Sequence, residues 1–120
     1  MKLEREAVSE QQWLALLARR QVGRLVYTAG ALPAVLPVRF RLDEDGSLLL
    51  RAPVTVGLAR AVNGAVVAFE SGEVNEADGS GWSVTVLGHA TATPGAGTVR
   101  LRSELVTGQR LVAVVAAEDR

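Results

Sequence analysis

Arg51 stands where the chain can bind an anion, because an apolar strand ends there and a helical pattern follows. Leu48–Leu50 form the end of that strand, and Thr55 precedes Leu58 in the spacing of a short helix. Backbone N–H groups at such a junction lack partners, and a guanidinium beside them can hold a phosphate. Arg51, Ala52 and Thr55 are therefore candidate phosphate-binding residues. The alternative is that Arg51 is a solvated arginine at a strand end.

The run Gly81–Val84, with the sequence Gly-Trp-Ser-Val, is a second candidate site. An indole followed by a hydroxyl can stack on a flat heteroaromatic ligand and hydrogen-bond to it, which makes Trp82 and Ser83 candidate binding residues. The alternative is that Trp82 caps the end of a barrel or packs in a dimer interface. His89 is interpreted as a hydrogen-bonded structural residue, because no serine and carboxylate stand at a spacing typical of a hydrolase triad. We expect no catalytic side chain.

The composition limits the classes of function. Hydrophobic residues make up 48% of the 120 residues and aromatic residues 4%, which favours one domain, residues 1–120, with a core of Val, Leu and Ala. Thirteen basic residues balance thirteen acidic ones, so no long-range field attracts nucleic acid. The absence of cysteine excludes disulfides, and the single histidine disfavours a metal site. A charged start and the lack of an apolar run of ~20 residues predict no membrane span and a cytoplasmic location.

Alternating apolar and polar residues predict strands along most of the chain. The expected strands are Arg24–Thr28, Leu32–Leu42, Leu48–Arg51, Ala65–Ser71, Trp82–Thr93, Val99–Val106 and Leu111–Ala117. An amphipathic helix precedes them at Ser9–Arg20, with Ser9 and Gln12 as a capping box, and a short helix ends at Asn63-Gly64. This order of elements predicts a mainly β fold, built as a small antiparallel barrel.

Residue types between the strands predict the turns. Asp45-Gly46 predicts a two-residue hairpin turn between two antiparallel strands. Ala65–Ser71 is expected to be buried on both faces, and the polar run Gly72–Gly81 to be a surface loop. Thr107–Arg110 is expected to separate the last two strands.

Four charged residues on the strands are candidates that we interpret structurally. Glu70 and Glu73 straddle a strand end and are interpreted as surface charges. Arg39 and Arg41 lie on the less apolar face of their strand and are interpreted as a solvated or dimer-facing pair.

Seven segments, in order along the chain, match the motifs of a known family. They are Leu14–Leu17, Val22–Val26, Leu32–Val38, Arg51, Val67–Glu70, Gly81–Ala90 and Val106–Leu111. With these segments the chain resembles the pyridoxamine 5′-phosphate oxidase-like, FMN-binding split-barrel family over most of its length.

The resemblance implies a six-stranded antiparallel split β-barrel that forms a homodimer, with FMN in two symmetric clefts across the interface. It implies that Arg51, Ala52 and Thr55 hold the FMN phosphate, and that the isoalloxazine lies along Val38, Trp82 and Ser83. The implied function is FMN-dependent oxidation or reduction of an unidentified small molecule. The flavin itself carries the hydride or electrons, so no side chain needs to act as an acid or base.

Three positions depart from the pattern of many relatives. Ala52 stands where they place a threonine, Gly57 where they place a lysine, and Pro94–Gly97 replaces a helical segment. The first two changes remove a hydroxyl and a cation from the phosphate corner, and each such charge-assisted contact contributes roughly 1.5 to 3 kcal/mol. Two alternatives therefore stay open: a cofactor-free split-barrel homodimer that serves as a binding or structural module, and a deazaflavin-dependent reductase.

Overall fold

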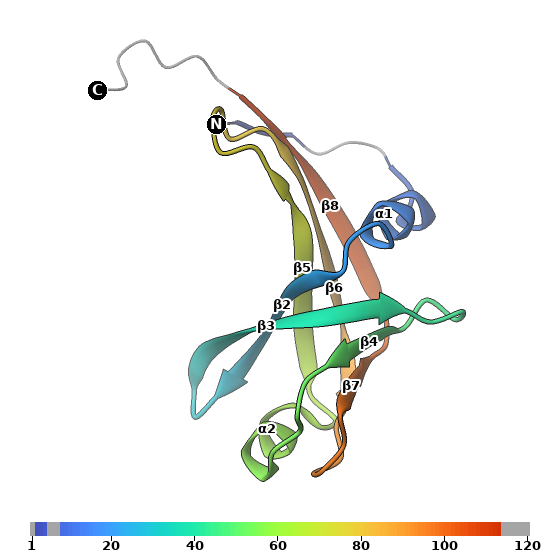
Figure 1. The fold of residues 1–120 in the computed structure, drawn as a ribbon, viewed down its shortest axis with the longest axis vertical. Helices are drawn as coiled ribbons and strands as arrows, with labels where there is room; N and C mark the ends of the chain where they lie inside the picture. The colour runs from blue at the N-terminus through green and yellow to red at the C-terminus, as the bar shows by residue number, and fades with distance from the viewer. Residues whose placement is uncertain (1, 5–7, 114–120) are drawn as a thin grey trace.

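The computed structural model describes residues 2–4 and 8–113, which form eight strands and two helices (Figure 1). The strands are β1 Lys2–Glu4, β2 Val22–Ala29, β3 Leu32–Leu42, β4 Leu48–Arg51, β5 Val66–Val74, β6 Gly81–Thr91, β7 Thr98–Leu101 and β8 Leu105–Val112. The helices are α1 Glu10–Leu17 and α2 Val56–Val62. Neither of the helices in this part of the chain has the length and apolar character needed to cross a membrane.

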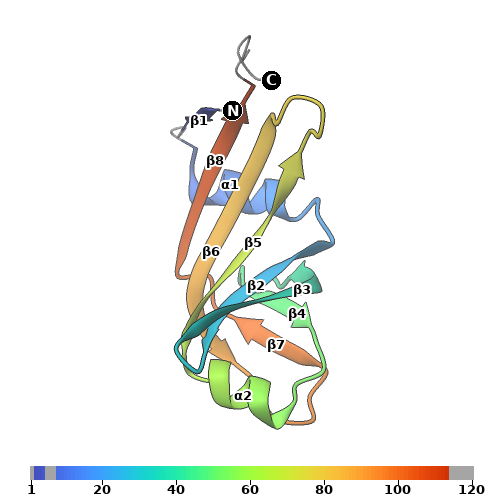
Figure 2. The same ribbon diagram turned by 90° about the vertical axis from the view of Figure 1, so that its left-hand side faces the viewer.

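Six of the strands close into an antiparallel barrel in the order β6, β5, β2, β3, β4 and β7, with β7 pairing back onto β6. β8 continues the sheet along β6 beyond this ring, and β1 pairs along β8. Figure 2 shows β6 and β8 side by side as long strands, with α2 at the end of the molecule far from β1. The predicted six-stranded antiparallel split barrel is confirmed.

The barrel core is built from alternate residues of each strand, because successive side chains point to opposite faces. Leu25, Phe40 and Phe69 are buried, and the rings of the two phenylalanines lie 4.6 Å apart at an interplanar angle of 59°. A tilted aromatic pair of this kind contributes about 0.5–1.5 kcal/mol beyond the burial of its area. Arg24 and Arg39 belong to the alternate set, which faces outward and is exposed. The outer face of the barrel is therefore the one open to ligands or to a partner chain.

Helix α1 packs on the buried face of β6 and β8. Ser9 Oγ accepts the N–H of Gln12 at 3.2 Å, and Gln12 Oε1 accepts the N–H of Ser9 at 2.9 Å, which confirms the capping box. Trp13 is buried against Gly108, where a Cβ atom would lie 2.2 Å from the indole ring. Gly108 is thus required by packing rather than by a turn.

The C-terminal strands differ from the prediction because the interruption lies earlier in the chain. The predicted strand Val99–Val106 is broken into β7 and β8, and the predicted separator Thr107–Arg110 lies inside β8. Both strands pair along the same edge of β6, and the break between them crosses Gly88, whose Cβ would lie 1.7 Å from the carbonyl oxygen of Arg102. The predicted strand Leu111–Ala117 extends, at 114–117, outside the described residues.

The hairpin between β3 and β4 has a longer turn than predicted. The two strands pair antiparallel as expected, but the last paired residues are Leu42 and Leu48, which leaves the five residues Asp43–Ser47 in the turn. A two-residue turn would shift the register by one, and such a shift moves every side chain to the opposite face. The observed register instead places Arg39 directly opposite Arg51.

β5 is buried on one face only, and not on both as predicted. Val67 and Phe69 are buried, whereas Val66 is 61% exposed. The strand also continues to Val74, so the surface loop comprises residues 75–80 instead of starting at Gly72. The exposed face of β5 belongs to the outside of the barrel.

Candidate functional site

The strand-to-helix corner predicted to bind an anion lies between β4 and α2. Arg51 ends β4 with an exposed side chain on the outer face of the barrel. Thr55 is the N-cap of α2, and its Oγ1 accepts the N–H of Leu58 at 3.0 Å. Since a hydroxyl both accepts and donates, the O–H of Thr55 is still able to donate to a ligand.

Ala52 has no group to offer a ligand at this corner. It is 4% exposed, and its N–H donates to the carbonyl oxygen of Gly97 at 3.1 Å. The N–H of Val54 donates to the carbonyl oxygen of Ala96 at 2.9 Å, and Pro53 has no N–H. The turn before β7 thus occupies the backbone donors expected for a phosphate, which leaves the guanidinium and the first N–H groups of α2.

Val38 lies inside the barrel rather than on its outer face. Its side chain is 5% exposed, and the residue pairs with Gly23 across β3 and β2. A ligand on the outer face can therefore meet only the backbone of Val38.

Trp82 and Ser83 point to opposite faces of the sheet, because they are successive residues of β6. Trp82 packs against the core and its Nε1 donates to Glu73 Oε1 at 3.1 Å. Ser83 Oγ donates to Glu70 Oε2 at 2.9 Å, and Arg24 Nη1 donates to Glu70 Oε1 at 2.9 Å. The two glutamates, interpreted from the sequence as surface charges, thus accept hydrogen bonds from neighbouring side chains: Glu73 from Trp82, and Glu70 from Ser83 and Arg24. Only Ser83 belongs to the outer face.

The strand registers align outward side chains in a row across the barrel, which we term the outer row. Arg51 on β4 lies opposite Arg39 on β3, and Arg39 lies opposite Val22 on β2. At the other end Ser83 on β6 lies opposite Gly72 on β5. Arg51 and Ser83 are therefore four strand spacings apart, about 19 Å along the curved sheet at ~4.8 Å per strand.

A cleft of about 200 Å³ lies in the middle of the outer row. It is lined by Arg20, Val22, Gly23, Arg24, Pro37, Ser71 and Gly72. Arg20 Nε is buried and has no hydrogen-bond partner among the described residues, and Arg20 Nη1 lies 3.7 Å from Glu73 Oε2. Unpaired buried donors are rare in native proteins, so the cleft is a candidate site for an acceptor group. Because cofactor pockets typically measure about 300–1,000 Å³, this cleft by itself holds only part of a flavin.

His89 has a carboxylate partner that sequence spacing did not reveal. Its Nδ1 lies 2.8 Å from Glu104 Oε2, across the place where the chain passes over Gly88. The hydrogen bond from His89 lowers the pKa of the Glu104 carboxyl below its usual value. In the part of the chain that the structure describes, no serine hydroxyl bonds to His89, and no three ligating side chains gather as they would around a metal ion.

Several known proteins share this fold. An FAD-binding protein of Mycobacterium smegmatis is 25% identical and superposes with a TM-score of 0.74, covering 91% of this chain and 98% of that one. An FAD-binding protein from Mesorhizobium loti is 18% identical, with a TM-score of 0.71 over 92% of this chain and 99% of that one, and shows the same fold.

Sequence relatives place the chain in a family. The uncharacterized protein Rv0080 of Mycobacterium tuberculosis is 40% identical over 83 residues, which are 65% of this chain and 54% of that protein. The chain thus spans about half the length of this curated relative. The family model described as pyridoxamine 5′-phosphate oxidase matches residues 9–118. The chain therefore belongs to the pyridoxamine 5′-phosphate oxidase family.

Proposed function

We propose that the chain binds FMN as a homodimer and uses it to oxidise or reduce a small molecule. The observation that carries this proposal is the outer row, in which the guanidinium of Arg51 and the hydroxyl of Ser83 both lie on the outer face of the barrel, with a cleft between them along the row. A guanidinium binds a phosphate bidentately, and fixed hydroxyl and carboxylate groups orient the polar edge of a ring.

Each end of the outer row contributes a different part of this site. Arg51 binds the phosphate, and the O–H of Thr55 adds a donor from the N-cap of α2. Arg24, Glu70 and Ser83 are hydrogen-bonded to one another, so their positions are fixed before a ligand arrives. A flavin bound there supplies hydride or electron transfer, while these side chains hold and orient it.

Exposed apolar side chains on the outer face support the homodimer. Five large apolar residues of this face are between 47% and 61% exposed: Val22, Val35, Val66, Val74 and Leu105. They are spread along β2, β3, β5 and β8, where contact with a partner chain is more favourable for apolar side chains than contact with water. A second copy on this face would bury these side chains and would cover the cleft, which is too small to enclose a flavin alone.

FMN is proposed over other flavins because the outer row ends on an arginine suited to a terminal phosphate. The M. smegmatis relative is named for binding FAD, so FAD is a direct competitor in any test. A deazaflavin presents a ring of the same shape to the same cleft, and its affinity has to be measured beside the other two.

A cofactor-free homodimer that serves as a binding or structural module is the second candidate. It is favoured by the corner itself, where the N–H groups of Ala52 and Val54 are engaged within the chain. Gly57 also brings no cation to the first turn of α2.

Titration of the purified protein with FMN, FAD and a deazaflavin separates these candidates. We expect saturable quenching of FMN fluorescence, a rise in Tm and a dimer by light scattering. If no flavin co-purifies and saturating FMN, FAD and deazaflavin leave fluorescence and Tm unchanged, the oxidoreductase proposal is wrong and the cofactor-free module stands. A monomer that binds flavin would overturn the homodimer alone.

A further inference from the structure

Strands β3, β4 and β7 are neighbours in the barrel wall (Figure 2). Their registers place two arginines and a threonine side by side on the outer face. Arg51 on β4 is the direct partner of Arg39 on β3 and, on its other side, of Thr98 on β7. All three side chains are exposed. Directly opposed residues have Cβ atoms about 4.5–5.5 Å apart, and like charges in such a pair destabilise a sheet.

Neither arginine of this pair has a carboxylate partner among the described residues. Arg39 Nη2 makes one long contact, 3.4 Å to Gln21 Oε1, with a neutral amide. By contrast, Arg20, Arg24 and Arg100 each lie within 4 Å of a carboxylate. Two adjacent guanidinium groups without a counter-charge favour a ligand that carries two negative charges in one group.

We infer that Arg39 is a second phosphate-binding residue and that Thr98 donates its hydroxyl to the same phosphate. This inference rests on the proposed function, in which the flavin phosphate meets Arg51. It names the group recognised: a terminal phosphate monoester, whose oxygens can accept from two guanidinium forks at once. In this chain Arg39 and Thr98 thus supply the cation and the hydroxyl that Gly57 and Ala52 do not.

Affinities for FMN and for riboflavin, which lacks the phosphate, test this assignment. Arg39→Gln should weaken FMN binding about tenfold or more and leave riboflavin binding unchanged, because only the phosphate loses a charge-assisted contact. Thr98→Val should weaken FMN binding by a smaller factor, with riboflavin again unaffected. Arg39→Lys should retain most of the FMN affinity, since the charge remains.

Arg41→Gln is the matched control, because Arg41 is exposed on the same face of β3 and pairs with Leu49 instead of Arg51. It removes the same charge from the neighbouring row, and FMN affinity should stay within about twofold of the parent protein. Tm measured for every variant verifies that each remains folded.

The outcomes separate this inference from the proposed function. If the parent protein binds FMN and Arg39→Gln behaves like Arg41→Gln, Arg39 is no phosphate ligand while flavin binding stands. If Arg39→Gln weakens riboflavin as much as FMN, the residue contacts the ring or maintains the fold, and the assignment is wrong. If the parent protein binds no flavin, the proposed function fails and this inference fails with it.

Discussion

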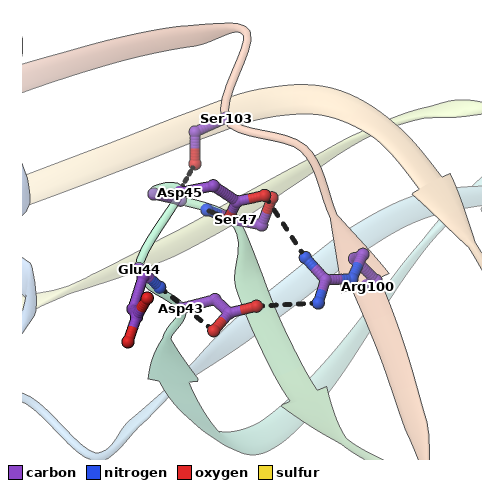
Figure 3. Close-up of polar contacts among 7 residues, drawn as sticks. Asp43, Glu44, Asp45, Ser47, Arg100 and Ser103 are labelled. Carbon is purple, nitrogen blue, oxygen red and sulfur yellow. Dashed lines mark hydrogen bonds and ion pairs between the residues drawn. The ribbon is translucent and has the colours of Figure 1, made fainter.

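Arg100 and Arg51 lie on neighbouring strands, β7 and β4, and show two uses of an arginine in one barrel wall. Arg100 Nη2 lies 2.8 Å from Asp43 Oδ2, and Arg100 Nη1 lies 3.6 Å from Asp45 Oδ2 (Figure 3). These contacts join β7 to the turn of the β3–β4 hairpin. Arg51, one row away, has no carboxylate partner among the described residues. The chain thus neutralises one charge internally and leaves the other available.

The hairpin turn is held by hydrogen bonds among its own residues, from β7 and from the segment between β7 and β8. Ser47 N–H donates to Asp45 Oδ1 at 2.9 Å, and Ser103 Oγ donates to the carbonyl oxygen of Gly46 (Figure 3). The hydrogen bond from Arg100 lowers the pKa of Asp43 below its usual value. A charge whose partners lie in the chain stabilises the fold, whereas a charge without them is free to bind a ligand. The two regions should therefore respond oppositely to substitution.

Removal of the Arg51 charge should give the largest effect on binding. Arg51→Gln is expected to weaken FMN binding about 10- to 100-fold, because hydrogen bonds to charged groups contribute roughly 1.5–3 kcal/mol and 1.4 kcal/mol is tenfold in affinity. Tm of the unliganded protein should not fall, since no internal partner is lost. Arg60→Gln, at an exposed site in the last turn of α2, is the control. An equal loss in both variants would show that only general charge matters.

Addition of a cation to the open corner should raise affinity. At Gly57 a new Cβ would lie 3.9 Å from Thr55 Oγ1, so a side chain fits without a clash. Gly57→Lys is expected to tighten FMN binding up to about tenfold. Gly57→Gln separates this charge effect from the higher helix propensity that any replacement of glycine brings. Equal affinity in the two variants would place the phosphate away from α2.

Removal of the Arg100 charge should affect the fold and spare the site. Arg100→Gln is expected to lower Tm, by an amount that shrinks at high salt because the ion pair is partly solvated. FMN affinity should stay at the parent value. Thermal unfolding and FMN titration of the same preparation check both points. A loss of FMN affinity comparable with that of Arg51→Gln would erase the distinction between the two arginines.

The pH dependence of stability should give the smallest effect. The pKa values of Asp43 and Asp45 are lowered from 3.8, by hydrogen bonds from Arg100 and from Ser47 respectively. A carboxylate with a lowered folded-state pKa stabilises the protein above its unfolded pKa, and this stability is lost as pH falls through the folded value. The Tm advantage of the parent protein over Arg100→Gln should therefore be constant near neutral pH and shrink below about pH 4. A difference that stays constant to about pH 3 would contradict this account.

Much of the fold could be predicted from the sequence, because alternation and capping are local signals. β3 and the capping box of α1 were predicted as found. β8 was not predicted correctly, because Thr107–Arg110 contains a glycine and was read as a turn between two strands. In the structure Gly108 lies within β8, where the absence of a side chain leaves room for the ring of Trp13. The sequence alone does not distinguish a glycine required by packing from a glycine required by a turn, because the side chain that packs on it is known only from the fold.

The candidate site was harder to predict, because its residues meet through strand register. The residue types of Arg51 and Ser83 were enough to make them candidate binding residues. The pairing of Arg51 with Arg39 was not predicted, because the two-residue turn expected at Asp45-Gly46 would have placed Arg39 one position away from Arg51. The five-residue turn sets the observed pairing. The involvement of Glu70 with Arg24 likewise depends on pairing across β2 and β5, which no local spacing indicates.

The two tryptophans occupy contrasting surroundings and so equip the molecule with its own optical probes. Trp13, on the buried face of α1, is 4% exposed and packs against β8, so its emission reports on unfolding of the domain. Trp82 is half-buried beside Glu73, a carboxylate that also lies near Arg20 of the cleft. Iodide in solution should quench the fluorescence of Trp82 and leave that of Trp13 unchanged. The intrinsic fluorescence of one unlabelled sample therefore distinguishes ligand binding near the cleft from unfolding of the whole domain.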